Sequence, residues 1–118
     1  MSQNTPAFGY SKTDLSNTAV LVRTGSGRIT TMELRNINTA DAFVQFFDAA
    51  AAADVTVGST SSIPFFIPGS DGTNRSSNAK DFGDRGFFFR KGLVIAATTS
   101  ETNGTAPSSA ISLTLTIA

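Results

Sequence analysis

An unbroken alternation near the end of the sequence restricts the possible folds more strongly than any other segment. Residues 111–117 read ISLTLTI, so aliphatic residues alternate with Ser or Thr without interruption. Because successive side chains of a β-strand point to opposite faces, this pattern predicts a half-buried strand. The 30 Ser and Thr residues, set against three Lys, two Glu and two Gln, also favour strands and polar turns. The residues expected to face the core are Ile111, Leu113, Leu115 and Ile117.

Alternating or apolar segments separated by polar turns recur along the chain at intervals near ten residues, and seven or eight of them fit into its 118 residues. This spacing predicts an all-β, antiparallel β-sandwich with a jelly-roll-like arrangement, formed as a single domain by residues 19–118. Residues 1–18 are polar and contain Pro6, so they predict an extended N-terminal arm anchored by Phe8 and Tyr10. The alternative for these residues is a disordered tail.

Several segments carry more specific predictions. Residues 19–23 and 28–37 flank the flexible sequence TGSG, which predicts a β-hairpin. The strand predicted around IPFFIP contains Pro64 and ends at Pro68, and proline donates no backbone hydrogen bond, so this strand is expected to lie at a sheet edge or to be very short. Polar loops are predicted at residues 70–80 and 98–109, and a short alternating piece is predicted at residues 55–57.

Residues 42–54, AFVQFFDAAAAAD, fit two different structures. Phe43, Phe46, Phe47 and Ala50 have helical spacing, and the run of five Ala has high helix propensity. Against a helix, the pairs Phe-Val and Phe-Phe are typical of a strand that is buried on both faces. We favour a strand that ends at residue 48, followed by an Ala-rich connection.

The residue types that are absent exclude most familiar chemistry. The chain has no His and no Cys, so it lacks a thiol nucleophile, a Ser-His-Asp arrangement and a Cys/His zinc site. We therefore expect neither an enzyme nor a cofactor. Nine basic residues balance nine acidic ones without forming a stripe, and no apolar run approaches eighteen residues, so neither nucleic acid nor a membrane is expected as a partner. Residues 1–12 lack the pattern of a secretion signal.

One loop contains oxygen-bearing side chains of the kind that calcium accepts. Asp71, Asp81 and Asp84 lie near Asn74 and Asn78 in the sequence. Their spacing matches no EF-hand or other dense ligand pattern, so we favour solvated turns and expect no metal site.

Aromatic residues are the most informative feature for function. The segments Phe87–Phe89 and Phe65–Ile67 would place large apolar groups on both sides of a thin sandwich. One side fills the core, whereas the other must be buried against another subunit or beneath a loop of the same chain. We favour a subunit or capsid interface over loop cover. The candidate interface residues are Phe8, Tyr10, Phe65, Phe66, Phe82, Phe87 and Phe88.

A succession of short motifs runs from residue 19 to the last strand. It comprises AVLVR at 19–23, Gly27-x-Ile29 before Met32-x-Leu34-x-Asn36, FVQFFD at 43–48, IPFFIPG at 63–69, and Phe87-x-Phe89-x-x-GLVIAATT ending at Thr99. Over residues 19–118 this succession resembles small virion proteins of tailed bacteriophages. It is similar in particular to the jelly-roll capsid decoration, or cement, proteins. The run Ala49–Ala53 is richer in Ala than that pattern.

The resemblance implies a structural protein that is made in the host cytoplasm and sits on the outer surface of a phage head. It implies a homotrimer at three-fold and local three-fold positions, where it clamps adjacent major capsid proteins. The alternative is a head-fibre or tail-associated module with a lectin-like role in adhesion to host polysaccharide. In that case the loop from Asp71 to Asp84, with Phe82, would supply acidic, amide and aromatic groups.

Overall fold

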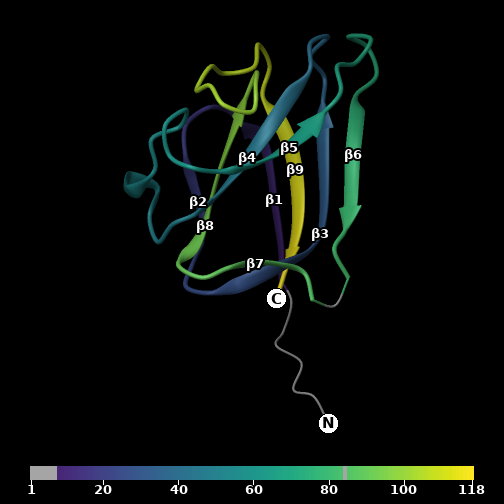
Figure 1. The fold of residues 1–118 in the computed structure, drawn as a ribbon. Coiled ribbons are helices and arrows are strands. Elements are labelled where there is room, and N and C mark those ends of the chain that lie inside the picture. Colours follow the sequence, from purple (N-terminus) through teal and green to yellow (C-terminus); the bar gives the residue numbers. More distant parts are fainter. Residues whose placement is uncertain (1–7, 84) are drawn as a thin grey trace.

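Two antiparallel β-sheets pack face to face in the computed structural model, which describes residues 8–83 and 85–118 (Figure 1). The strands of this part of the chain are β1 (Phe8–Leu15), β2 (Val20–Thr24), β3 (Gly27–Asn36), β4 (Ala42–Asp48), β5 (Ile63–Ile67), β6 (Ser76–Asp81), β7 (Phe87–Phe89), β8 (Gly92–Thr98) and β9 (Ile111–Ile117). One short 3₁₀ turn, η1 (Ala52–Asp54), lies between β4 and β5.

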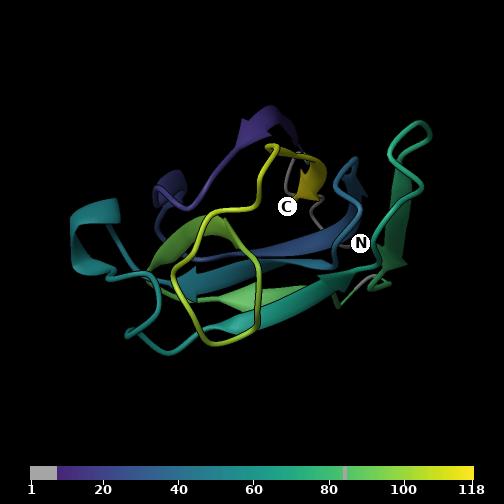
Figure 2. The ribbon, with the colours of Figure 1, turned by 90° about the horizontal axis from the view of Figure 1, so that it is seen from above.

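The strand order confirms the predicted β-sandwich of jelly-roll type. The five-stranded sheet has the order β1-β9-β3-β6, with β7 also paired to β3, and the four-stranded sheet has the order β2-β8-β4-β5. The chain changes sheet at most of its connections, which is the winding of a jelly roll. Figure 2 shows β1 and β9 on one side of the sandwich and β5 and β8 on the other.

The core lies between the two sheets and is built from alternate residues of the strands. The alternation predicted for β9 is confirmed, because its four aliphatic residues are fully buried. In β8, by contrast, every residue is buried. Leu93 and Ile95 face the main core, whereas Val94 and Ala96 belong to a second apolar cluster on the outer face of the same sheet. Strand β8, an inner strand of the four-stranded sheet, is therefore covered on both faces.

The segment with two possible structures forms the favoured one. Ala42–Asp48 is strand β4, paired with both β5 and β8, and the Ala-rich residues after it form a connection that contains η1. Val44 and Phe46 face the main core, while Phe47 faces the second cluster. Burial on both faces explains why a strand is formed in spite of the high helix propensity of the Ala residues.

The predicted hairpin of residues 19–23 and 28–37 is wrong. Strand β2 pairs with β8 in one sheet, whereas β3 pairs with β6, β7 and β9 in the other. Between them Gly25 adopts a φ of 90°, which favours glycine, and its N–H donates to the Lys91 carbonyl oxygen. The TGSG segment thus crosses between the sheets, so that Val20 and Ile29 approach the core from opposite sides.

Two further predictions meet different outcomes at the edges of the sheets. Strand β5, which contains Pro64, lies at an edge as expected. The loop predicted at residues 70–80 is wrong for its second half, because Ser76–Asp81 is strand β6. The backbone of β6 is held by the ladder to β3, and most of its side chains are exposed, so a polar sequence is compatible with this edge position. Residues 55–57 form no strand.

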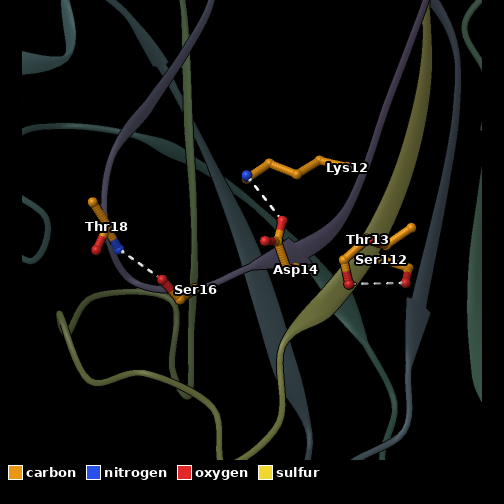
Figure 3. Close-up of polar contacts among 6 residues, drawn as sticks. All are labelled: Lys12, Thr13, Asp14, Ser16, Thr18 and Ser112. Carbon is orange, nitrogen blue, oxygen red and sulfur yellow. Dashed lines mark hydrogen bonds and ion pairs between the residues drawn. The ribbon is translucent and has the colours of Figure 1, made fainter.

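The N-terminal segment differs from the predicted arm. Residues 8–15 form the edge strand β1, which pairs with β9 through a register shift between Lys12 and Leu15. At this irregularity Lys12 pairs with Asp14 over 2.9 Å, and the Ser112 hydroxyl donates to the Thr13 carbonyl oxygen (Figure 3). Leu15 is fully buried in the main core. The sheet therefore extends into the predicted arm, and residues 1–7 lie outside the described residues.

Candidate functional site

Four of the seven aromatic candidates pack inside the chain. Phe65, Phe82 and Phe87 form one cluster with the buried side chain of Phe46, with ring centroids 5.0–6.2 Å apart. Most of these pairs are edge to face, which is a favoured aromatic geometry. Tyr10 is half-buried against the main core. These four candidates contribute chiefly to packing within the subunit.

The other three candidates are exposed. Phe88 has 66% of its surface accessible, because its neighbours in β7 face inward and strand geometry turns it outward. Phe66 is 44% exposed and lies against Phe43, with ring centroids 5.5 Å apart. Phe8 is 39% exposed, with the Arg23 guanidinium over its ring at 5.5 Å. These three candidates are therefore accessible to solvent.

The outer face of the four-stranded sheet is covered by loops of the same chain. Val55 and Val57, after η1, pack over the cluster of Phe47 and Val94. Loop cover, the alternative that the sequence left open, thus occurs over β4 and β8. It does not extend to Phe88 or Phe66, which remain exposed.

A buried amide fastens these loops. Gln45 is 1% exposed, and its Nε2 donates to Thr98 Oγ1 over 2.8 Å and to the Asn103 carbonyl oxygen over 3.1 Å. Its Oε1 accepts a hydrogen bond from the Ser62 hydroxyl over 2.9 Å. The sequence alone does not predict this role for Gln45 or its partners. A polar residue between Val44 and Phe46 in a strand buried on both faces was the available signal.

A hollow of about 250 Å³ opens beside β7. It is lined mainly by apolar side chains, among them Phe46, Ile63 and Phe88. Its carboxylate, Asp48, already accepts hydrogen bonds from the backbone N–H groups of Arg90 and Lys91. Sites for small molecules usually occupy about 300–1,000 Å³. The hollow is smaller than this range.

Asp71 and Asp81, the described acidic residues of the predicted loop, serve as turn caps and are not gathered into one site. Asp71 accepts the backbone N–H groups of Thr73 and Asn74, and Asp81 accepts that of Gly83. The N–H groups of Asn74 and Thr73 lower the pKa of Asp71 below its ordinary value. Strand β6, which spans roughly 17 Å at about 3.3 Å per residue, lies between the two carboxylates in the chain.

This separation bears on the metal and polysaccharide interpretations of the loop. Phe82 lies at the Asp81 end of β6 and in the aromatic cluster, so it does not join Asp71 in one surface. Among the residues that the structure describes, no group of three or more His, Cys, Asp or Glu could hold a metal ion. Asp84 lies outside the described residues.

The described geometry therefore defines a jelly-roll β-sandwich with exposed aromatic residues. Comparison of the sequence with known proteins finds no matching family model and no significantly similar curated protein. Among the described residues, no helix is long and apolar enough to cross a membrane.

Proposed function

We propose that the protein is a structural component of a bacteriophage virion. It decorates the outer surface of the head and stabilises it by clamping adjacent major capsid proteins, as a homotrimer at three-fold and local three-fold positions. The support is the sequence resemblance to jelly-roll decoration proteins, together with a fold of that type. The proposal requires docking surfaces, and neither nucleic acid, a membrane nor a cofactor takes part.

The observation that carries the proposal is the exposure of Phe88. A side chain of this size, 66% exposed on a short strand whose flanking residues are fixed in the core, is costly in water. Burial of one such Phe against a partner contributes roughly 2 kcal/mol. Because the strand is already ordered, little conformational entropy is lost when a partner binds.

A second apolar surface is available for contacts between subunits. Phe66 and Phe43 lie together on the outer face of β4 and β5, at the edge of the four-stranded sheet. Loops cover the neighbouring strands but leave Phe66 44% exposed. This surface and Phe88 lie on different elements, so a trimer contact and a shell contact can be made at the same time.

The proposal is tested with phage heads assembled without this protein. Purified protein is mixed with expanded heads, the heads are sedimented, and the bound protein is quantified against concentration. Saturable binding, with three copies at each three-fold and local three-fold position, supports the proposal. Binding to host polysaccharide without binding to heads would contradict it and favour the adhesion module.

A further inference from the structure

The fold gathers basic residues that are scattered in the sequence. We call the lower end of the sandwich in Figure 1 the β7 end; it holds β7, the β2–β3 turn, the β7–β8 turn and the last residues of β9. Five of the nine basic residues of the chain lie there. They are Arg23, Arg28, Arg85, Arg90 and Lys91.

Strand pairing fixes most of this gathering. Thr24 pairs with Gly92, and the Gly25 N–H donates to the Lys91 carbonyl oxygen over 2.8 Å, so the ends of β2 and β8 lie together. Arg28 pairs directly with Phe88 across β3 and β7. Gly86, which follows Arg85, lies so close to the Arg28 side chain that an added Cβ would be 3.0 Å from it. The five basic residues thus belong to one continuous surface.

The basic side chains of this end form no salt bridge with a described acidic side chain. The two salt bridges among the described residues, Lys12–Asp14 and Arg35–Glu33, lie elsewhere. The described carboxylates beside the β7 end are Asp48 and Asp81, and both accept backbone N–H groups of turns. The loops at the opposite end carry Asp41, Asp71 and Glu101. Among the described residues, the β7 end thus holds more basic than acidic side chains.

Exposed aromatic side chains lie within the basic surface. Arg23, Arg28 and Phe88 together line a hollow of about 320 Å³. Arg23 also covers the Phe8 ring at 5.5 Å, which holds both side chains in place before a partner arrives. A protruding aromatic residue surrounded by charged side chains is the common arrangement of a protein-binding hot spot and its rim.

We propose that the β7 end is the surface that docks onto the shell, and that its target is an acidic protein surface with an apolar recess for Phe88. This inference rests on the proposed function and adds the docking face and the chemistry of its target. Four of the five basic residues are Arg, whose planar fork pairs bidentately with carboxylates. A single-stranded nucleic acid would need a basic groove that follows its backbone. The basic residues of the β7 end are instead grouped around Phe88.

Two variants with matched controls test the assignment. Arg85→Glu/Arg90→Glu reverses two exposed charges at the β7 end, and Lys12→Glu/Arg75→Glu makes the same change in net charge on β1 and in the β5–β6 loop. Phe88→Ala removes the exposed ring, with the exposed Leu21→Ala as its control. Circular dichroism and urea unfolding establish that each variant is folded before its binding to heads is measured.

We expect the β7-end variants to bind heads at least about tenfold more weakly and the controls to stay within about twofold of the wild type. Wild-type binding should also weaken between 50 and 200 mM salt. Binding of the β7-end variants equal to that of the wild type would overturn this inference and leave the proposed function intact. Failure of the wild type itself to bind heads would contradict the proposed function and this inference together.

Two further measurements examine other occupants of the same surface. A labelled 20-nucleotide oligo-dT is titrated with wild type and with Arg85→Glu/Arg90→Glu. Tight binding that is lost in the variant, while head binding is unchanged, would overturn the inference in favour of nucleic acid. Light scattering at rising concentration tests the acidic end of a second copy. A mass that grows without limit in the wild type, but not in the variant, would overturn it in favour of head-to-tail association.

Discussion

The side-chain amide of Gln45 donates a hydrogen bond to the hydroxyl of Thr98 over 2.8 Å, and both residues are almost fully buried. They lie on the neighbouring strands β4 and β8 and face outward from the sandwich. The same amide reaches Asn103 in the β8–β9 loop and accepts from Ser62 before β5. One buried residue thus holds two loops over the outer face of the four-stranded sheet.

Gln45→Leu should destabilise the fold by about 2–3 kcal/mol, because it leaves several buried polar groups without a partner. The free energy of unfolding is measured by urea denaturation. The control is Ser59→Ala, at an exposed residue of the same loop region whose side chain makes no hydrogen bond to a described residue. It should change the free energy of unfolding by less than about 0.5 kcal/mol. Equal effects of the two substitutions would show that the amide does not hold the loops.

Adjacent residues of β7 should have separate effects. Phe87→Ala opens a cavity in the aromatic cluster and should lower the free energy of unfolding by about 2–4 kcal/mol. This range is below that of a fully buried Phe because Phe87 is only partly buried. Phe88→Ala removes a ring that is 66% exposed and should change stability by less than about 0.5 kcal/mol. Thermal and urea unfolding of both variants measure this contrast. A large loss of stability in Phe88→Ala would refute its role as a free docking residue.

Asp48 makes the stability of the β7–β8 turn dependent on pH. Desolvation raises the pKa of Asp48, but the backbone N–H groups of Lys91, Arg90 and Gly92 outweigh it and lower the pKa below its ordinary value. A carboxyl whose pKa is lower in the folded chain stabilises the fold above about pH 4 and loses this effect as the pH falls through the folded value.

Asp48→Asn should therefore lower the free energy of unfolding by about 1 kcal/mol at pH 7, a value reduced because the side chain is exposed. The difference from wild type should vanish toward pH 2. Urea denaturation at several pH values measures it. Asp54→Asn is the control, since the Asp54 carboxylate makes no hydrogen bond to a described residue. A difference between wild type and Asp48→Asn that persists unchanged at pH 2 would refute the ionic origin of the effect.

Deletion of residues 1–15 should unfold the chain or destabilise it by at least about 3 kcal/mol. The deletion removes an edge strand and the fully buried Leu15, and the loss of one buried Leu side chain alone costs about 2–5 kcal/mol. Deletion of residues 1–7 leaves every described contact of β1 in place and serves as the comparison. Unchanged stability after the longer deletion would restore the arm predicted from the sequence.

The sequence predicts the strands whose signals are local. The alternation of β9 predicts which of its side chains face the core, and Pro64 predicts that β5 lies at a sheet edge. The correct structure of β4 also follows from its residues, because paired aromatic and β-branched side chains outweigh the helix propensity of the Ala run.

Features that depend on distant pairing could not be predicted in this way. Strand β6 is polar and has no alternation, and it is a strand because β3 supplies its hydrogen-bond partners. The TGSG segment resembles a hairpin turn, yet it crosses between the sheets, since both of its flanking strands pair with strands far along the chain. The same applies to β1, which pairs with the C-terminal strand.

The candidate docking residues divide for a similar reason. Strand alternation correctly separates Phe88 from Phe87 and Phe89 but does not say which face is covered. The three-dimensional winding brings Phe65, Phe82 and Phe87 into one cluster and leaves Phe66 outside it. It also gathers the basic residues of the β7 end, which lie in separate parts of the sequence and show no stripe there.

The most direct measurement of the proposed role is a cryo-electron microscopy difference map between heads with and without this protein. The account predicts added trimeric density on the outer surface at the three-fold and local three-fold positions, with the β7 end of each subunit toward the shell. Heads whose outer surface is identical in the two maps would contradict it.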